Sequence, residues 1–89
     1  MATVHFTPQL ERFVHAPVVE AAGATVAEVL AAVFTDHPAL KSYVVDDQGA
    51  GRKHVALFID GVQIRDRQRL SDAVDATSEI YIFQALSGG

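Results

Sequence analysis

Cysteine is absent from this 89-residue sequence. The chain can therefore form no disulfide, thiolate metal site or iron–sulfur cluster, and it has no cysteine nucleophile. Positive charge is also scarce, with 7 Lys and Arg against 11 Asp and Glu and a formal net charge of −4. Because a nucleic-acid-binding domain needs a basic stripe, this balance argues against nucleic acid and favours a protein partner.

Long hydrophobic runs are missing as well. The opening segment Met1–Phe6 has neither a basic region nor a long apolar stretch, so we expect no secretory signal, no transmembrane span and a cytoplasmic location. The sequence is nevertheless 49% apolar. We therefore expect one domain over residues 1–89, which buries roughly 60 to 65% of its unfolded surface, with a flexible tail over residues 85–89.

Two hairpins are predicted by strand-like alternation and turn residues. Residues Thr3–Phe6 alternate between apolar and polar, and Ala16–Ala21 forms a second strand that pairs with them. Further along, Asp60-Gly61 separates the strand-like runs His54–Ile59 and Val62–Ile64. Asp-Gly is a favoured two-residue hairpin turn, so this is the strongest local signal in the chain.

One main helix is predicted between the hairpins. Thr25 and Glu28 form a capping box, in which the Thr25 hydroxyl accepts from the Glu28 amide and the Glu28 carboxylate returns to the Thr25 amide. Pro38 stops the helix near Asp36 or His37, and Ala39–Val45 is expected to form a short second turn that covers an edge of the core. The apolar residues of the helix fall at helical spacing: Val26, Val29, Leu30, Val33 and Phe34.

The resulting order, β-β-α-β-β-β, fits an α+β fold of the β-grasp, ubiquitin-like type. In such a roll a mixed sheet packs on one main helix, with the first and last strands adjacent and parallel.

The last two long strands are apolar on both faces. One alternate set faces the helix, and nothing in so short a chain remains to cover the other, unless loop residues such as Leu10 or Phe13 fold back over it. A contiguous exposed apolar patch usually marks a protein-binding surface. The patch consists of Ala56, Phe58, Tyr81 and Phe83.

The sequence closes with Leu86-Ser87-Gly88-Gly89. Neither glycine has a Cβ, so a carboxylate on Gly89 is unhindered and can enter a narrow channel in another protein. The alternative interpretation is a frayed, Gly-rich tail without a role.

With these features the chain resembles the MoaD/ThiS family of ubiquitin-like sulfur carriers. The resemblance rests on Ala85–Gly89, on Asp75–Phe83, on the helix opening Gly23–Val26 with Leu30, and on Val55–Gly61. In that family an enzyme of the ubiquitin-activating type adenylates the C-terminal glycine carboxylate. The adenylate is converted to a thiocarboxylate, which gives its sulfur to a precursor held by a partner enzyme.

The resemblance assigns roles to the tail and partners to the chain. It makes Gly89 the attachment site and Gly88, Ser87 and Leu86 the residues that a partner recognises. It implies no catalytic residue, no bound cofactor, and ATP and Mg²⁺ used by the activating partner. The sulfur acceptor would be of the molybdopterin synthase large-subunit, thiazole synthase or cysteine synthase type. The loop Asp46–Lys53 and the hairpin resemble the molybdopterin- and cysteine-pathway carriers more than the shorter thiamine carrier. We expect the molybdopterin type first, then cysteine or thiamine.

Two other functions remain open. A ubiquitin-like modifier would use the same activated Gly89 to form an isopeptide bond with a lysine of a target protein. A non-covalent β-grasp interaction module would make no use of the terminal glycines at all.

Three sets of polar residues could suggest other sites. Four histidines lack the spacing of metal ligands, so we expect them on the solvated surface and expect no metal site: His5, His15, His37 and His54. Three aspartates fit turns better than a catalytic carboxylate pair: Asp66, Asp72 and Asp75. Three alternating arginines would share one side of an extended segment, more simply as a solvated edge than as a site for phosphate or an acidic loop: Arg65, Arg67 and Arg69.

Overall fold

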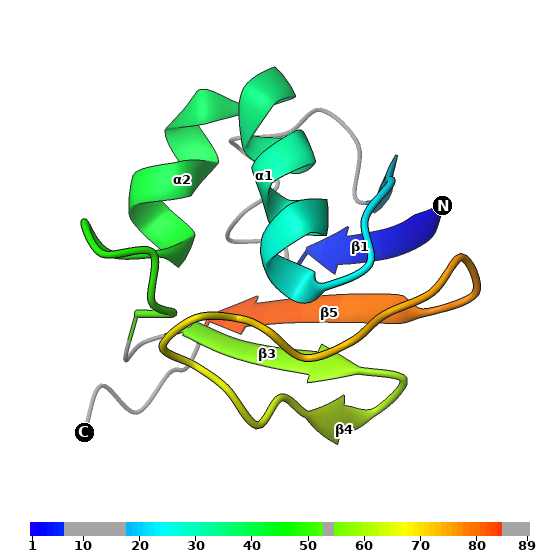
Figure 1. Ribbon diagram of the computed structural model, residues 1–89. Coiled ribbons are helices and arrows are strands. Elements are labelled where there is room, and N and C mark those ends of the chain that lie inside the picture. Colours follow the sequence, from blue (N-terminus) through cyan, green and yellow to red (C-terminus); the bar gives the residue numbers. More distant parts are fainter. Residues whose placement is uncertain (7–17, 53–54, 85–89) are drawn as a thin grey trace.

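A computed structural model gives the structure of the chain and describes residues 1–6, 18–52 and 55–84. Two strands, two helices and three strands follow one another: β1 (Ala2–Phe6), β2 (Val18–Ala21), α1 (Val26–Asp36), α2 (Pro38–Val44), β3 (Val55–Ile59), β4 (Val62–Gln63) and β5 (Glu79–Gln84). Both helices lie on one side of the sheet (Figure 1). Neither of these described helices is long and apolar enough to cross a membrane.

The sheet has the strand order β2-β1-β5-β3-β4. The first and last strands, β1 and β5, are adjacent and parallel, whereas β2 pairs antiparallel with β1, and β3 pairs antiparallel with both β5 and β4. This arrangement confirms the predicted β-grasp roll. The first hairpin is also confirmed over Val18–Ala21, while residues 16 and 17 lie outside the described residues.

Helix α1 begins as its capping residues predict, with one difference. The Glu28 amide donates to Thr25 Oγ1 at 3.2 Å, but the Glu28 carboxylate accepts from the Ala24 amide at 2.9 Å, one residue before the expected Thr25 amide. The chain before α1 is held extended because Val26 N donates to Asp72 O and Val74 N donates to Ala24 O. This pairing brings the Ala24 amide to the carboxylate.

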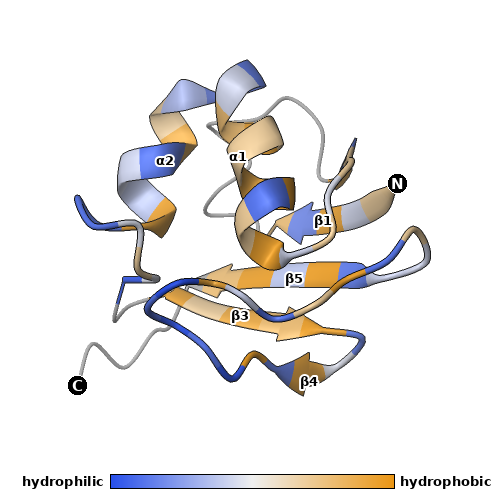
Figure 2. Ribbon diagram, in the orientation of Figure 1, coloured by the Kyte–Doolittle hydropathy of each residue, from blue (hydrophilic) through white to orange (hydrophobic). Residues whose placement is uncertain are grey.

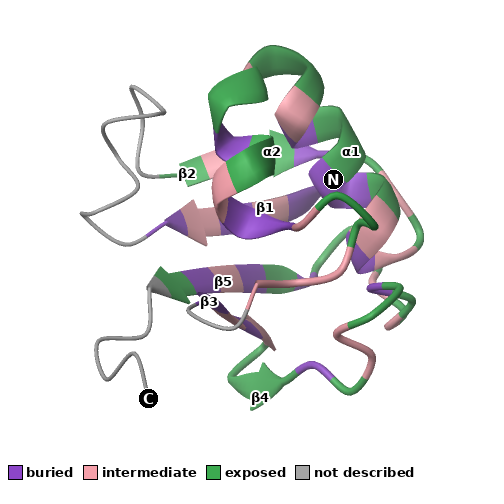
Figure 3. Cartoon of the chain, turned by 90° about the vertical axis from the view of Figure 1, so that its left-hand side faces the viewer, coloured by how far each residue is buried: buried purple, intermediate pink, exposed green. Residues whose placement is uncertain are grey.

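The core lies between the helices and one face of the sheet, and buried and partly exposed residues alternate along β1 and β5 (Figure 3). The predicted α1 stripe supplies four buried residues, and Phe34 packs against them half-buried. Full burial of one such aliphatic side chain stabilises the fold by about 1.5–3 kcal/mol. Where only a short turn was expected, α2 is a helix of 7 residues, and it buries both Leu40 and Val44.

The Asp60-Gly61 turn is confirmed, with φ angles of 50° and 87°. Positive φ at both central residues is the type I′ geometry, whose twist matches that of the flanking strands. Leu70 also has a positive φ, of 55°, and its side chain is buried under the start of α1, where its carbonyl accepts from Ala27 N.

Candidate functional site

The face of the sheet opposite the helices carries the predicted apolar patch. Both β3 and β5 are largely hydrophobic along their length (Figure 2). Their antiparallel register pairs Ala56 with Phe83 and Phe58 with Tyr81, while Leu57 pairs with Ile82 on the core side. Phe83 keeps 42% of its surface exposed, and the other three residues of the patch are half-buried. All four residues therefore share the open face.

The aromatic rings of this patch contact one another in an ordered way. The Phe58 and Phe83 rings meet edge to face with centroids 5.6 Å apart, and the Tyr81 and Phe83 rings are parallel within 6° at 6.1 Å. The rings border a hollow of about 590 Å³. Its lining comprises Phe58, Asp60, Gly61, Glu79, Tyr81 and Phe83.

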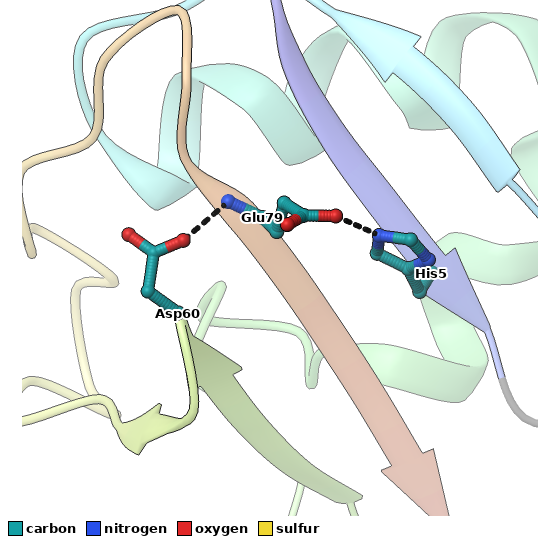
Figure 4. Close-up of polar contacts among 3 residues, drawn as sticks. All are labelled: His5, Asp60 and Glu79. Atoms are coloured by element: carbon teal, nitrogen blue, oxygen red, sulfur yellow. Dashed lines mark hydrogen bonds and ion pairs between the residues drawn. The ribbon is translucent and has the colours of Figure 1, made fainter.

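Two carboxylate residues, Asp60 and Glu79, line the hollow, and His5 contacts Glu79 from β1 (Figure 4). The Glu79 amide donates to Asp60 Oδ1 at 2.9 Å, and His5 Nε2 lies 3.0 Å from Glu79 Oε1. The His5 ring is stacked on Tyr81, with centroids 4.3 Å apart and planes at 9°. The carboxylate residues Asp60 and Glu79 therefore border the aromatic patch on the side where β5 begins.

The sequence-based interpretation missed this group. His5 was expected on the solvated surface, but it is half-buried and paired, because β1 runs parallel to β5 and sets His5 beside Tyr81. The alternation of the first strand does show that His5 lies on the outer face. Its partners could be recognised only once the pairing of β1 with β5 was known. His15 and His54 lie outside the described residues.

The tail residues predicted as the attachment and recognition site lie outside the described residues: Leu86, Ser87, Gly88 and Gly89. Leu10 and Phe13, which might have covered the patch, lie outside them as well. The structure does describe the strand that leads into the tail. Gln84, the last residue of β5, pairs with Val55, next to the pair of Phe83 and Ala56. Phe83 of the patch therefore lies one residue before the last described residue of β5.

The three alternating arginines do not share one side of an extended segment, so that expectation was wrong. Arg67 turns inward, and its Nη2 donates to Val55 O at 2.8 Å and to the carbonyls of Gly51 and Arg52. Arg65 and Arg69 are exposed. The segment curls because β4 ends at Gln63 and a turn follows it.

The three aspartates serve as turn residues, as predicted. Asp72 accepts from the amides of Arg65 and Asp66, and Asp66 in turn accepts from the Ser71 hydroxyl. The Ser71 hydrogen bond, assisted by backbone amides, lowers the pKa of Asp66. The Thr77 hydroxyl and amide likewise lower the pKa of Asp75. Each carboxylate has a structural role in its loop.

Among residues 1–6, 18–52 and 55–84, no three His, Asp or Glu side chains gather closely enough to hold an ion. An apolar cleft of about 340 Å³ lies on the helix side, between α1, α2 and Leu70. A third hollow, of about 520 Å³, lies beside α2, with Lys41, Asp46 and Asp47 in its lining. The aromatic hollow is distinguished from both by its three rings.

The chain matches no functionally curated protein, but it is similar to several solved structures. Among solved structures, SAMP1 from Haloferax volcanii is 28% identical over 99% of this chain and 98% of that one, with a TM-score of 0.79. A chain of the BexX/CysO complex from Amycolatopsis orientalis is 24% identical, with all of both chains covered and a TM-score of 0.88. CysO from Mycobacterium tuberculosis is 18% identical, with 97% and 100% covered and a TM-score of 0.86.

The two CysO-related likenesses show the same fold. The family is shown by a different observation, because residues 4–89 match the sequence model described as the ThiS family. This match extends through the diglycine and confirms the resemblance seen in the sequence. The chain therefore belongs to the ThiS family of ubiquitin-like sulfur-carrier and modifier proteins.

Proposed function

We propose that this protein is a sulfur carrier whose Gly89 carboxylate is adenylated and then converted to a thiocarboxylate. The observation that carries the proposal is the family match, which runs to residue 89 and so includes the diglycine. The geometry supports it, since β5, the last described strand before the diglycine in the sequence, carries Tyr81 and Phe83 of the aromatic patch. Under this proposal the chain is a substrate protein and supplies no catalytic residue.

The proposed chemistry has two steps. The carboxylate attacks the α-phosphorus of ATP, pyrophosphate leaves, and an acyl adenylate forms. Sulfide then attacks the acyl carbon, forming a C–S bond while the C–O bond to AMP breaks, and the thiocarboxylate results. A persulfide in its place would give an acyl disulfide, from which a thiol must release the thiocarboxylate by cleaving the S–S bond and forming a disulfide with the other sulfur. The activating enzyme supplies Mg²⁺ and positions the phosphates, so this chain needs no cofactor of its own.

The aromatic patch is the proposed docking surface for the partners. An exposed apolar patch beside the start of the tail lets a partner bind the sheet and the tail at once. We propose two partner types, an adenylyltransferase of the ubiquitin-activating type and a sulfur-acceptor enzyme, both in the cytoplasm. The Amycolatopsis orientalis structure, which is a complex of BexX with CysO, supports the expectation of a protein partner.

A modifier function is the second candidate. It is favoured by the 28% identity to SAMP1 of Haloferax volcanii, a small archaeal modifier protein. A modifier would transfer the activated Gly89 acyl group to a lysine amine of a target. The two functions share activation and differ in whether sulfur or an amine takes the acyl group.

Intact-mass spectrometry tests the proposal. The chain is incubated with the adenylating enzyme of its own cell, ATP, Mg²⁺ and a sulfide source. Exchange of oxygen for sulfur at the terminal acyl group adds about 16 Da. A variant without Gly89 should show no change, and it is the matched control. If an active cognate enzyme leaves the mass unaltered, the carrier function is wrong; isopeptide-linked adducts in its place would favour the modifier.

The identity of the sulfur acceptor is tested in a separate experiment, which starts from the purified thiocarboxylate form of the chain. Acceptor enzymes of the molybdopterin synthase, cysteine synthase and thiazole synthase types are offered in parallel. We expect the molybdopterin-type acceptor to take the sulfur, as the hairpin and the loop before it suggest. Transfer to one of the others would leave the carrier function standing and correct the acceptor.

A further inference from the structure

The hollow on the open face combines aromatic walls with carboxylates. Phe58, Tyr81 and Phe83 form the walls, and the turn of Asp60 with Glu79 forms one end. The side chain of Glu79 is 51% exposed, so it is accessible to a ligand. Aromatic faces attract cations through the ring quadrupole, and a nearby carboxylate strengthens that attraction.

No described strand supplies a cation to this face, since none contains a lysine or an arginine. Four arginines are described, Arg52 and the alternating three, and all lie in the connections before β3 and after β4. The described lysine, Lys41, lies in α2 on the helix side of the sheet. Among the described residues, therefore, none places a positively charged side chain in the lining of the hollow.

His5 shows which kind of group fits here. Its flat ring lies on Tyr81 at a centroid distance of 4.3 Å, and the same ring places Nε2 3.0 Å from Glu79 Oε1. A planar group that stacks on an aromatic ring and presents an N–H to a carboxylate thus already occupies the β1 side of Glu79. The hollow lies on the β3 side of Glu79, because β5 runs between β1 and β3.

We propose that the hollow receives an arginine side chain of the protein that binds this face. The inference rests on the proposed function, in which this face is a docking surface. The guanidinium is planar, stacks on aromatic rings and donates N–H groups in a fixed fork, whereas a lysine ammonium is a compact, strongly hydrated charge. Tyr81 or Phe58 supplies the stacking surface and Glu79 the charge.

Asp60 has a lesser part in this recognition. Its Oδ1 is occupied by the Glu79 amide, and Oδ2 has no hydrogen bond within the described residues. Asp60 therefore adds negative potential at the end of the hollow while its position is fixed by the turn. Glu79 is the residue whose replacement tests the inference.

The first test uses N-acetyl-arginine amide as the probe. Its binding to the whole chain is followed by amide chemical shifts, with N-acetyl-lysine amide as the comparison. We expect millimolar arginine amide to shift the signals of Phe58, Glu79 and Tyr81, and lysine amide to bind several-fold more weakly. Equal binding of the two probes, or no shift with either, overturns the inference.

Variants give the second readout. Glu79→Gln keeps the side-chain shape and should raise the dissociation constant for arginine amide, and for the adenylating enzyme, at least about tenfold. Glu20→Gln, on the far strand β2 of the same sheet, should leave both constants unchanged. Phe58→Leu keeps the apolar bulk but removes the ring, so it tests the aromatic wall.

The outcomes separate this inference from the carrier function. If Glu79→Gln binds arginine amide and the adenylating enzyme as wild type does, and the activation assay shows the normal mass shift, the arginine site is rejected and the carrier function stands. Selective arginine binding with no mass shift keeps the site and rejects the carrier. A matching amide spectrum away from the hollow shows that each variant is folded.

Discussion

Asp60 and Glu79 hold each other through reciprocal hydrogen bonds. The Asp60 amide donates to the Glu79 carbonyl at 2.8 Å, and the Glu79 amide donates to Asp60 Oδ1 at 2.9 Å. The pair closes the ladder between β3 and β5 at the turn. It fixes the register that sets Phe58 beside Tyr81 on the open face, and a slip of β3 by one residue would turn Phe58 toward the core.

Replacement of Asp60 tests the contribution of these two hydrogen bonds to stability. Asp60→Ala removes the acceptor and places an alanine at a φ of 50°, so we expect a loss of about 1–3 kcal/mol in the free energy of unfolding. Asp60→Asn keeps an acceptor oxygen and tolerates the left-handed conformation, and it should stay close to wild type. Urea unfolding measures both. Equal losses for the two variants would show that the charge matters and the hydrogen bond does not.

Gly23 is required by a close approach to the start of α1. A Cβ at this position would lie 2.7 Å from Val29 N and 2.8 Å from Glu28 Cβ. Because the backbone atom cannot move aside cheaply, Gly23→Ala should lower the stability by about 1–3 kcal/mol. Gly49→Ala is the matched control, since nothing lies within 4 Å of its Cβ and only its φ of 84° opposes the change. In thermal unfolding, the melting temperature of Gly23→Ala should be lower than that of Gly49→Ala.

The Asp66 loop predicts a dependence of stability on pH. The Ser71 hydroxyl and backbone amides lower the pKa of Asp66 below its ordinary value of 3.8. A depressed folded-state pKa stabilises the fold above the unfolded value, and this stabilisation is lost as the pH falls through the folded pKa. Ser71→Ala should raise the pKa of Asp66, as carboxyl NMR titration would show.

The same variant has a signature in unfolding experiments. The urea midpoint of Ser71→Ala should fall below that of wild type at neutral pH, and the gap should narrow as the pH drops below 3.8. A gap that is constant across this range would mean that the hydroxyl stabilises the loop without acting on the carboxylate.

Arg67 ties the start of β3 to the loop that follows β4. Its Nη2 donates to Val55 O at 2.8 Å and to Gly51 O at 3.4 Å, besides the carbonyl of Arg52. Arg67→Met removes the donor from the carbonyls of Gly51 and Val55, whereas the Arg52 carbonyl still accepts from the Val55 amide, and we expect a cost of about 1–3 kcal/mol. Amide hydrogen exchange at Gly51, Arg52 and Val55 should accelerate. Arg69→Met, at an exposed position, should stay within about 0.5 kcal/mol of wild type.

Local features of the fold were readable in the sequence because they depend on neighbouring residues. The helix stripe, the Thr25 cap and the Asp60-Gly61 turn each follow from side-chain chemistry within a few positions. Alternation along β3 and β5 also predicted which of their residues lie on the open face, namely Ala56, Phe58, Tyr81 and Phe83.

Other features depend on residues far apart in the chain. His5 meets Glu79 across 74 positions, and Arg67 reaches the Val55 carbonyl across 12. The stack of His5 on Tyr81 exists because β1 lies parallel to β5 in the centre of the sheet.

The amino-acid sequence by itself determined the elements, their buried faces and the diglycine that carries the family assignment. The tertiary structure alone decided that two carboxylates and three rings share one hollow, and that a histidine pairs with one of those carboxylates. The physical reason is that helical and strand periodicity act over a few residues, whereas strand order and register are fixed by burial of the whole apolar face of the sheet.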